Sequence, residues 1–476
     1  MLSRKVITVF ALTLVLCVSA SRAQDQQQDN APQAPIPPVQ SPDSDEGGTR
    51  QLPVPAATDL PGTGSPSDGI SIGDDSHPLT GAEAFGLGLP TGTHNLFDAA
   101  LHFNTGGSIG NQPGQTNFTL TAGGLAALNH SWNRYQFTAQ YSGAETFYRP
   151  DASANSAFQN LSADQTIRWK RTILRIRDDF GQSSGAAFGG LNTGGPGLTT
   201  AGITTTLAPT FVPSESILTG QADRVSDFVL GEVDYELSRR STLSFAGAYG
   251  LLHFLTSGYI DSQNEDGRVG YGYRIDRKNS LGFLYDYDHF TYSGGGGTVT
   301  SNVVQATYGR LLAARTAFQI SGGPQFVTST SGPSTLSWSA YASVTHQIRR
   351  TTLSAAYSHG ITNGSGVLLG AETDTATASI STVVWRFWQP SVTGGYSLNK
   401  SLATDSTAAG VAQYSNWFGT ANFGRLWDRM VQTNISYGLQ RQTQSGGCPV
   451  LSCGPETLYQ VFTFTVDFHL RPVGIR

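Results

Sequence analysis

After Val18 the sequence contains no long apolar run. A helix that crosses a bilayer needs about 20 consecutive apolar residues. This absence therefore excludes a helical membrane protein as the mature form. The only apolar run of any length lies between Val6 and Val18, close to the start of the chain.

That apolar run has the features of a secretory signal. Arg4 and Lys5 give a positive start, residues 6–18 are too short to remain as a spanning helix, and a small-x-small triplet follows at residues 21–23. This order is typical of a cleaved export signal. We expect residues 1–23 to be a signal peptide.

Charge is also scarce, since Asp, Glu, Lys and Arg make up 13% of the chain. The 29 Lys and Arg residues are scattered and are outnumbered by 34 Asp and Glu. The sequence therefore lacks the basic stripe of a nucleic-acid-binding protein. The expected partners are lipid and small polar solutes, with no nucleic acid, no metal and no cofactor.

Cysteine is rare, and only Cys448 and Cys453 follow the predicted cleavage site. An exported chain matures in an oxidising compartment, where such a pair forms a disulfide. A metal site would need two further soft ligands nearby, and the surrounding sequence has none. We expect a disulfide that closes a small loop.

Residues 24–95 are dominated by Gln, Asp, Pro, Gly and Ser and contain almost no aromatic side chains. A segment of this composition buries too little apolar surface to offset the entropy of ordering it. We expect a disordered periplasmic tether, which could recruit a periplasmic partner.

Segments in which apolar and polar residues alternate with a period of two recur from residue 96 to residue 470. In residues 431–440, Val, Thr, Ile, Tyr and Leu fall on one face and Gln, Asn, Ser and Gly on the other. Residues 268–276 and 336–345 repeat the pattern. Such alternation is typical of strands in a membrane β-barrel, so the sequence predicts an all-β barrel over residues 96–470, with residues 471–476 as a tail.

Short basic or aromatic turns separate these strands, alternating with longer Gly-rich loops. The turns are expected at residues 132–135, 170–171, 239–240, 277–278, 312–315, 349–350, 387–390 and 427–429. Eight turns, with one strand before the first and one after the last, predict eighteen strands, and sixteen is the alternative count. The long connection at residues 181–222 is either a constriction loop that folds inward or a disordered external loop.

The last predicted strand, residues 458–470, places Phe462, Phe464 and Phe468 on one face. It resembles the C-terminal signal by which the outer-membrane assembly machinery recognises its barrels, although residues 471–476 follow where such signals end on an aromatic residue. The chain as a whole resembles a porin-type protein of the Gram-negative outer membrane. The resemblance implies a transmembrane, antiparallel, up-and-down β-barrel, and it leaves the oligomeric state open.

Charged residues within the strands are expected to face the lumen, because Arg or Lys facing lipid at the midplane costs about 2–4 kcal/mol. A basic group and an acidic group then lie beside one another in the strands that flank the long connection. These candidate lumen residues are Arg168, Lys170, Arg171, Arg175, Arg177, Glu232, Asp234 and Glu236. The arrangement resembles a porin constriction, in which charges tune ion selectivity. Structural ion pairs that seal or stiffen the barrel are the alternative.

Catalysis finds little support in the sequence. In the best candidate segment, Asp286 and Asp288 lie on one face of a strand and His289 on the other, so acid and base do not meet. No Gly-x-Ser-x-Gly sequence sits on a predicted strand-to-helix turn, as a nucleophile elbow requires. Four further histidines are predicted to be isolated, namely His253, His346, His359 and His469.

The sequence therefore favours an outer-membrane pore for small polar solutes or ions and no enzyme. A closed structural barrel, or an envelope-assembly protein that uses the tether, is the first alternative, and an outer-membrane hydrolase is the second. An exported β-solenoid or adhesin is the alternative fold. Trp385, Trp388 and Trp427 lie near predicted turns, and we expect them in an interfacial aromatic girdle.

Overall fold

The computed structural model describes residues 96–110, 116–132, 134–149, 156–183, 224–255, 259–276, 278–294, 296–313, 315–330, 332–362, 368–385, 387–402, 413–428, 430–445, 457–470 and 473–474. The predicted signal peptide, the tether and the pair Cys448 and Cys453 lie outside these residues. Within the described residues there is no helix whose length and hydropathy would let it cross a membrane.

The described chain is built of antiparallel strands that follow one another in sequence order. The long strands are β1 (Leu96–Gly110), β2 (Thr116–Trp132), β3 (Tyr135–Arg149), β4 (Ser156–Arg168), β5 (Thr172–Ser183), β6 (Arg224–Glu236), β7 (Ser241–Phe254), β8 (Ser262–Arg274), β9 (Asn279–Tyr292), β10 (Thr298–Ala313), β11 (Thr316–Ser329), β12 (Gly332–Ile348), β13 (Thr351–Thr362), β14 (Ala371–Thr382), β15 (Trp388–Ser401), β16 (Gln413–Asp428), β17 (Val431–Ser445) and β18 (Thr457–His469). A two-residue strand, β19 (Val473–Gly474), completes the set.

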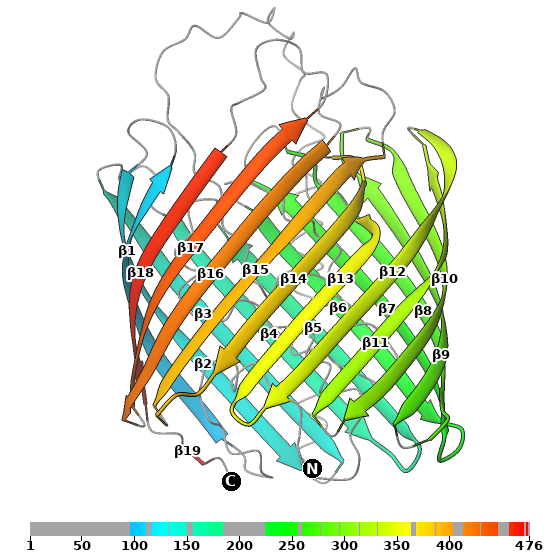
Figure 1. Ribbon diagram of the computed structural model, residues 1–476, viewed down its shortest axis with the longest axis horizontal. Coiled ribbons are helices and arrows are strands. Elements are labelled where there is room, and N and C mark those ends of the chain that lie inside the picture. Colours follow the sequence, from blue (N-terminus) through cyan, green and yellow to red (C-terminus); the bar gives the residue numbers. More distant parts are fainter. Residues whose placement is uncertain are drawn as a thin grey trace, which may run out of the picture. The chain divides into compact units, whose positions relative to one another are not determined.

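Pairing between the first and last long strands closes the sheet into a barrel. β1 pairs with β2 on one side and with β18 on the other, from Ala100 opposite His469 to Gly110 opposite Tyr459. Each of the strands β2 to β17 pairs with its two neighbours in sequence, which gives an up-and-down barrel of tilted strands (Figure 1). The prediction of eighteen long strands is confirmed. The sixteen-strand alternative is wrong, and closure excludes the β-solenoid.

The eight connections that the sequence predicted as turns all lie at one end of the barrel, at the bottom of Figure 1. We call this the turn end and the opposite end the loop end. Most turns fall where the sequence predicted them: Trp132 pairs with Tyr135 across the first, and Ile348 pairs with Thr351 across the sixth. In that sixth turn Arg349 has φ 52°, as tight hairpin turns require. The turn predicted at residues 387–390 lies instead between Thr382 and Trp388, because β15 already begins at Trp388.

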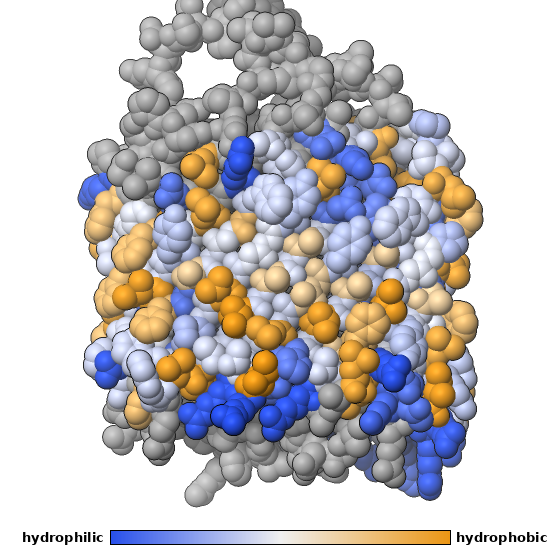
Figure 2. All heavy atoms as spheres, viewed as in Figure 1, coloured by the Kyte–Doolittle hydropathy of each residue, from blue (hydrophilic) through white to orange (hydrophobic). Residues whose placement is uncertain are grey.

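The two faces of each strand differ as the alternation predicts. In β8, Val269, Tyr271 and Tyr273 are exposed, whereas Gly270 and Gly272 between them are buried. In a closed barrel the exposed large apolar side chains mark the outer surface, so we call their positions outward and the alternate positions inward. Figure 2 shows hydrophobic residues across the middle of the outer surface and hydrophilic residues at the turn end. An apolar outer band of this kind faces lipid, so the architecture is that of a transmembrane barrel.

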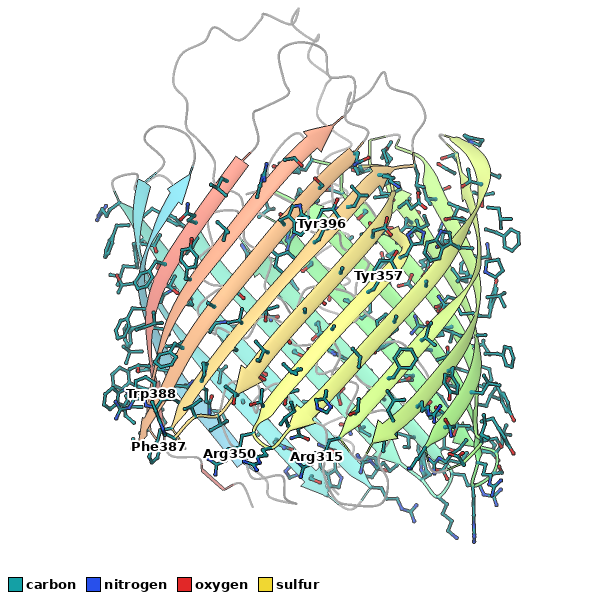
Figure 3. All side chains as sticks on the ribbon, viewed as in Figure 1. Arg315, Arg350, Tyr357, Phe387, Trp388 and Tyr396 are labelled. Atoms are coloured by element: carbon teal, nitrogen blue, oxygen red, sulfur yellow. The ribbon has the colours of Figure 1, made fainter. Side chains whose placement is uncertain are left out.

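Aromatic side chains gather at the turn end. Trp385 and Trp427 are exposed by 78% and 56%, and Trp388 stacks on Phe423 with 4.6 Å between ring centroids. Figure 3 shows Phe387 and Trp388 at this end, beside the turn between β14 and β15. The three tryptophans thus lie where an interfacial girdle requires them.

Inward positions are mainly Ser, Thr, Asn and Gln, and they bond to one another across strands. Thr121 and Thr146, for example, lie 3.0 Å apart between their hydroxyl oxygens. A small apolar core interrupts this polar lining near the loop end of β9, β10, β11 and β13. Its buried members are Phe290, Tyr292, Val299, Val327 and Ile361.

Candidate functional site

Charged inward side chains gather on neighbouring strands, from β4 to β9. In β5, Arg175, Arg177 and Asp179 occupy successive inward positions, while Leu174 and Ile176 point outward. We call the inward charged residues of β4 to β9 the charged wall. Away from the strand ends, its members are Asp164, Arg175, Arg177, Asp179, Glu232, Asp234, Asp266, Arg268, Asp286 and Asp288.

Arg175 links three strands of the charged wall. It lies directly opposite Glu232 of β6, with its Nη1 3.3 Å from Oε2 of that carboxylate. Its Nε lies 4.0 Å from an Asp164 oxygen on β4. The side chain of Arg175 is 20% exposed and that of Glu232 is 6% exposed. Oppositely charged groups from the two predicted sets therefore meet as direct neighbours.

Arg177 is neutralised within its own strand. Its Nε lies 2.5 Å from Asp179 Oδ2, and its Nη2 donates to Oδ1 of the same carboxylate at 3.1 Å. Across the sheet, Arg177 faces Leu230 of β6, which offers no charge, and Asp164 of β4. Asp234 faces Ile173 and is buried. The basic and acidic sets are thus joined through Arg175 and Glu232.

The remaining predicted lumen residues lie at the turn end. Arg168, Lys170, Arg171 and Glu236 are all exposed, at or next to the turns that follow β4 and β6. The structure therefore brings together half of the predicted set along the inner wall and leaves the other half at the rim.

A second ion cluster, on β8 and β9, was not among the predicted site residues. Arg268 holds Asp286 in a two-pronged contact, with Nε 2.5 Å from Oδ1 and Nη2 donating to Oδ2 at 3.2 Å. Asp266 lies directly opposite Asp288, and Asn264 donates to Asp266 at 2.8 Å. Alternation alone places all five side chains inward. Their meeting depends on the register between the two strands, which alternation does not specify.

The charged wall covers only part of the circumference. Along the middle of β10 to β17, the inward positions that the structure describes carry no charged side chain. Within the wall, carboxylates outnumber guanidinium groups, since only Arg175, Arg177 and Arg268 are basic. One side of the inner surface is thus acidic, and the facing side offers hydroxyl and amide groups.

The expectation that strand charges face the lumen is wrong for several carboxylates. Asp178 and Asp227 alternate with inward residues and point outward, as do Glu265 and Asp374. Three of these four lie three residues from the loop end of their strands, and Asp178 lies five residues from it. The cost of a charge on the lipid face falls towards the interface and is lower for Asp and Glu than for Arg and Lys, which permits these positions.

The histidine prediction also needs correction, because His359 is not isolated. Its Nδ1 lies 2.8 Å from Asp374 Oδ1, and Trp338 stacks on its ring with centroids 4.0 Å apart. The same Asp374 oxygen accepts a hydrogen bond from the Tyr357 hydroxyl at 2.8 Å. His253 likewise bonds to a carboxylate, and His346 to a hydroxyl. The pairing of neighbouring strands brings His359 and His346 to partners 15 and 30 residues away in sequence, which alternation alone does not predict.

These clusters do not assemble a hydrolase site. His289 points outward and bonds to Thr300 at 2.8 Å, whereas Asp286 and Asp288 point inward, so the first candidate stays divided between two faces. His359 bonds to Asp374 through Nδ1, and its Nε2 lies 3.3 Å from Glu372 Oε1, with no hydroxyl nucleophile bonded to its ring among the described residues. No group of described His, Cys, Asp and Glu residues has the arrangement of a metal site.

No protein-family model matches the chain, and no curated protein matches it in sequence. Similar solved structures come from Pseudomonas aeruginosa. OprD has a TM-score of 0.40 at 9% identity, and the match covers 80% of this chain and 96% of that one. OccK2 (OpdF) in complex with glucuronate has a TM-score of 0.41 at 10% identity, covering 80% and 98%. OpdK with vanillate has a TM-score of 0.41 at 8% identity, covering 79% and 99%. At these values the likeness assigns neither a family nor a solute to this chain.

Proposed function

We propose that this chain forms a pore in the bacterial outer membrane through which small polar solutes and ions pass. The observation that carries the proposal is the contrast between the two surfaces of one closed barrel. The outer surface is apolar, and the inner surface is lined by hydroxyl, amide and charged groups. Lipid on one side and water on the other account for that contrast.

The charged wall suggests what the pore prefers. Rings or walls of carboxylates favour cations in channels. Because carboxylates outnumber Arg in the wall, we propose a preference for cations over anions. The uncharged wall from β10 to β17 suits hydroxylated solutes, since Ser, Thr, Asn and Gln both donate and accept hydrogen bonds.

A closed or gated barrel is the second candidate, and burial of the inward side chains favours it. Ser301, Ser397, Asn399 and Thr465 all point inward, yet each is 0% exposed. Side chains that line a wide water-filled lumen would be more exposed to solvent than these four. A scaffold role, in which the predicted tether at residues 24–95 recruits a periplasmic partner, would need no open lumen.

Solute uptake separates the two candidates. We expect vesicles that contain the purified barrel to swell in isotonic solutions of small sugars, faster for a pentose than for a trisaccharide. The rate should scale with the amount of folded barrel, and heat-denatured protein is the control. Swelling no faster than that of protein-free vesicles, for every solute tested, would favour the closed barrel.

A further inference from the structure

Exposed positive charge surrounds the turn end of the barrel. Each of the six turns between β2 and β13 carries at least one exposed Arg or Lys. We define the turn-end basic ring by one residue from each: Arg134, Lys170, Arg240, Lys278, Arg315 and Arg350. Figure 3 shows Arg315 and Arg350 at this end, the end that also carries Phe387 and Trp388.

Little in the described protein neutralises this ring. None of its six members forms a salt bridge with another described residue. The exposed carboxylates described at this end are Glu236 and Asp276. Asp276 is already engaged, because it accepts hydrogen bonds from the Asn279 side chain at 2.7 Å and from the Lys278 backbone at 2.6 Å. These hydrogen bonds lower the pKa of Asp276 below its ordinary value.

The ring lies at the level of the aromatic girdle. Trp132 flanks Arg134 and stacks on Tyr135 with centroids 5.4 Å apart, and Trp169 precedes Lys170. Further round the barrel, Arg425 lies over the Trp427 ring, 3.6 Å from its centroid. Aromatic rings of this kind mark the headgroup level of a bilayer. Cations at that level lie close to the phosphate groups of the lipids.

We propose that the turn-end basic ring binds the phosphate groups of anionic phospholipids in the leaflet at that end. The charges follow the perimeter over six consecutive turns, as a surrounding lipid shell requires, whereas a docked protein would need one side only. Attraction between basic residues and an anionic leaflet grows with each charge and is screened by salt. The proposal is independent of whether the lumen conducts.

Tryptophan quenching by brominated lipid tests the ring directly. All seven tryptophans of the chain are described, and replacing Trp338 and Trp417 by Phe leaves only those near the turn end. The barrel is reconstituted in phosphatidylcholine vesicles that contain either brominated phosphatidylglycerol or brominated phosphatidylcholine. We expect the anionic lipid to bind at least about threefold more strongly in low salt, with the preference falling in 0.5 M NaCl.

A charge-neutralised variant and a matched control complete the test. Replacing all six members of the ring by Gln should lower the preference to nearly one, while the barrel still shows its heat-dependent gel shift. Replacing Arg149, Lys400 and Arg441, three basic residues exposed at the loop end, should leave it unchanged. Equal quenching by both lipids in the unmodified barrel would overturn the proposal. A preference that survives neutralisation of the ring would also overturn it.

Discussion

Replacing Gly323 by Ala is expected to prevent the barrel from folding stably. A Cβ on Gly323 would lie 1.8 Å from the Val304 carbonyl oxygen and 2.9 Å from its carbonyl carbon, both backbone atoms of the paired strand β10. Backbone cannot swing away as a side chain can, so the two strands would have to separate. The next residue, Pro324, has no N–H to donate, so the two strands lack a backbone hydrogen bond beside Gly323 that could help to hold them together. Overpacking costs about 1–3 kcal/mol in ordinary cores and occasionally more, and we expect at least the upper end here.

Urea unfolding of the folded barrel, followed by tryptophan fluorescence, measures this effect. The matched control is Gly267→Ala, because nothing lies within 4 Å of a Cβ built there. That control should unfold within about 1 kcal/mol of the unmodified protein. If Gly323→Ala unfolds at the same urea concentration as the control, the close approach of β10 and β11 is contradicted.

Replacing Arg268 by Gln should produce the second large loss of stability. The side chains of Arg268 and Asp286 are each 12% exposed, and Asp266 and Asp288 lie opposite one another on the same two strands. Removal of the guanidinium leaves three carboxylates close together with no cation between them. Breaking a buried ion pair from one side costs about 3–5 kcal/mol. We expect a free energy of unfolding lower by that amount.

A double-mutant cycle identifies the cause of this loss. Adding Asp286→Asn to Arg268→Gln should recover part of the stability, with a coupling of about 0.5–3 kcal/mol. Arg240→Gln is the matched control, since Arg240 is exposed and forms no salt bridge with a described residue. It should change stability by less than about 0.5 kcal/mol. If the effects of Arg268→Gln and Asp286→Asn on the free energy of unfolding are additive, the contact between these two side chains contributes nothing to stability.

Strand number and turn position were predictable because both follow from local pattern. Alternation with a period of two marks each strand by itself, and the basic pairs such as Arg349 and Arg350 mark the turns one hairpin at a time. The sum of these local signals gave the correct eighteen strands. Closure itself was also implied, because an apolar outer face needs a barrel without free edges.

The contacts within the charged wall could not be predicted from the sequence because they depend on the register between paired strands. Arg175 and Glu232 are 57 residues apart in sequence, and the pairing of β5 with β6 across residues 184–223 brings them face to face. The pairing of His359 with Asp374 depends in the same way on how β13 and β14 align. Asp178 and Asp227 point outward because the cost of a charge that faces lipid depends on its depth, and alternation does not specify the depth of a residue in the membrane.

The central claim, a conducting pore with an acidic inner wall, is tested most directly by the zero-current potential of the purified barrel in a planar bilayer. Across a tenfold KCl gradient, we expect steady conductance and a potential whose sign shows that K⁺ passes more readily than Cl⁻. Replacing Asp234 and Asp288 by Asn should reduce that potential, and neither carboxylate forms a salt bridge with a described residue. An absence of conductance would contradict the pore, and a potential of the opposite sign would contradict the acidic wall.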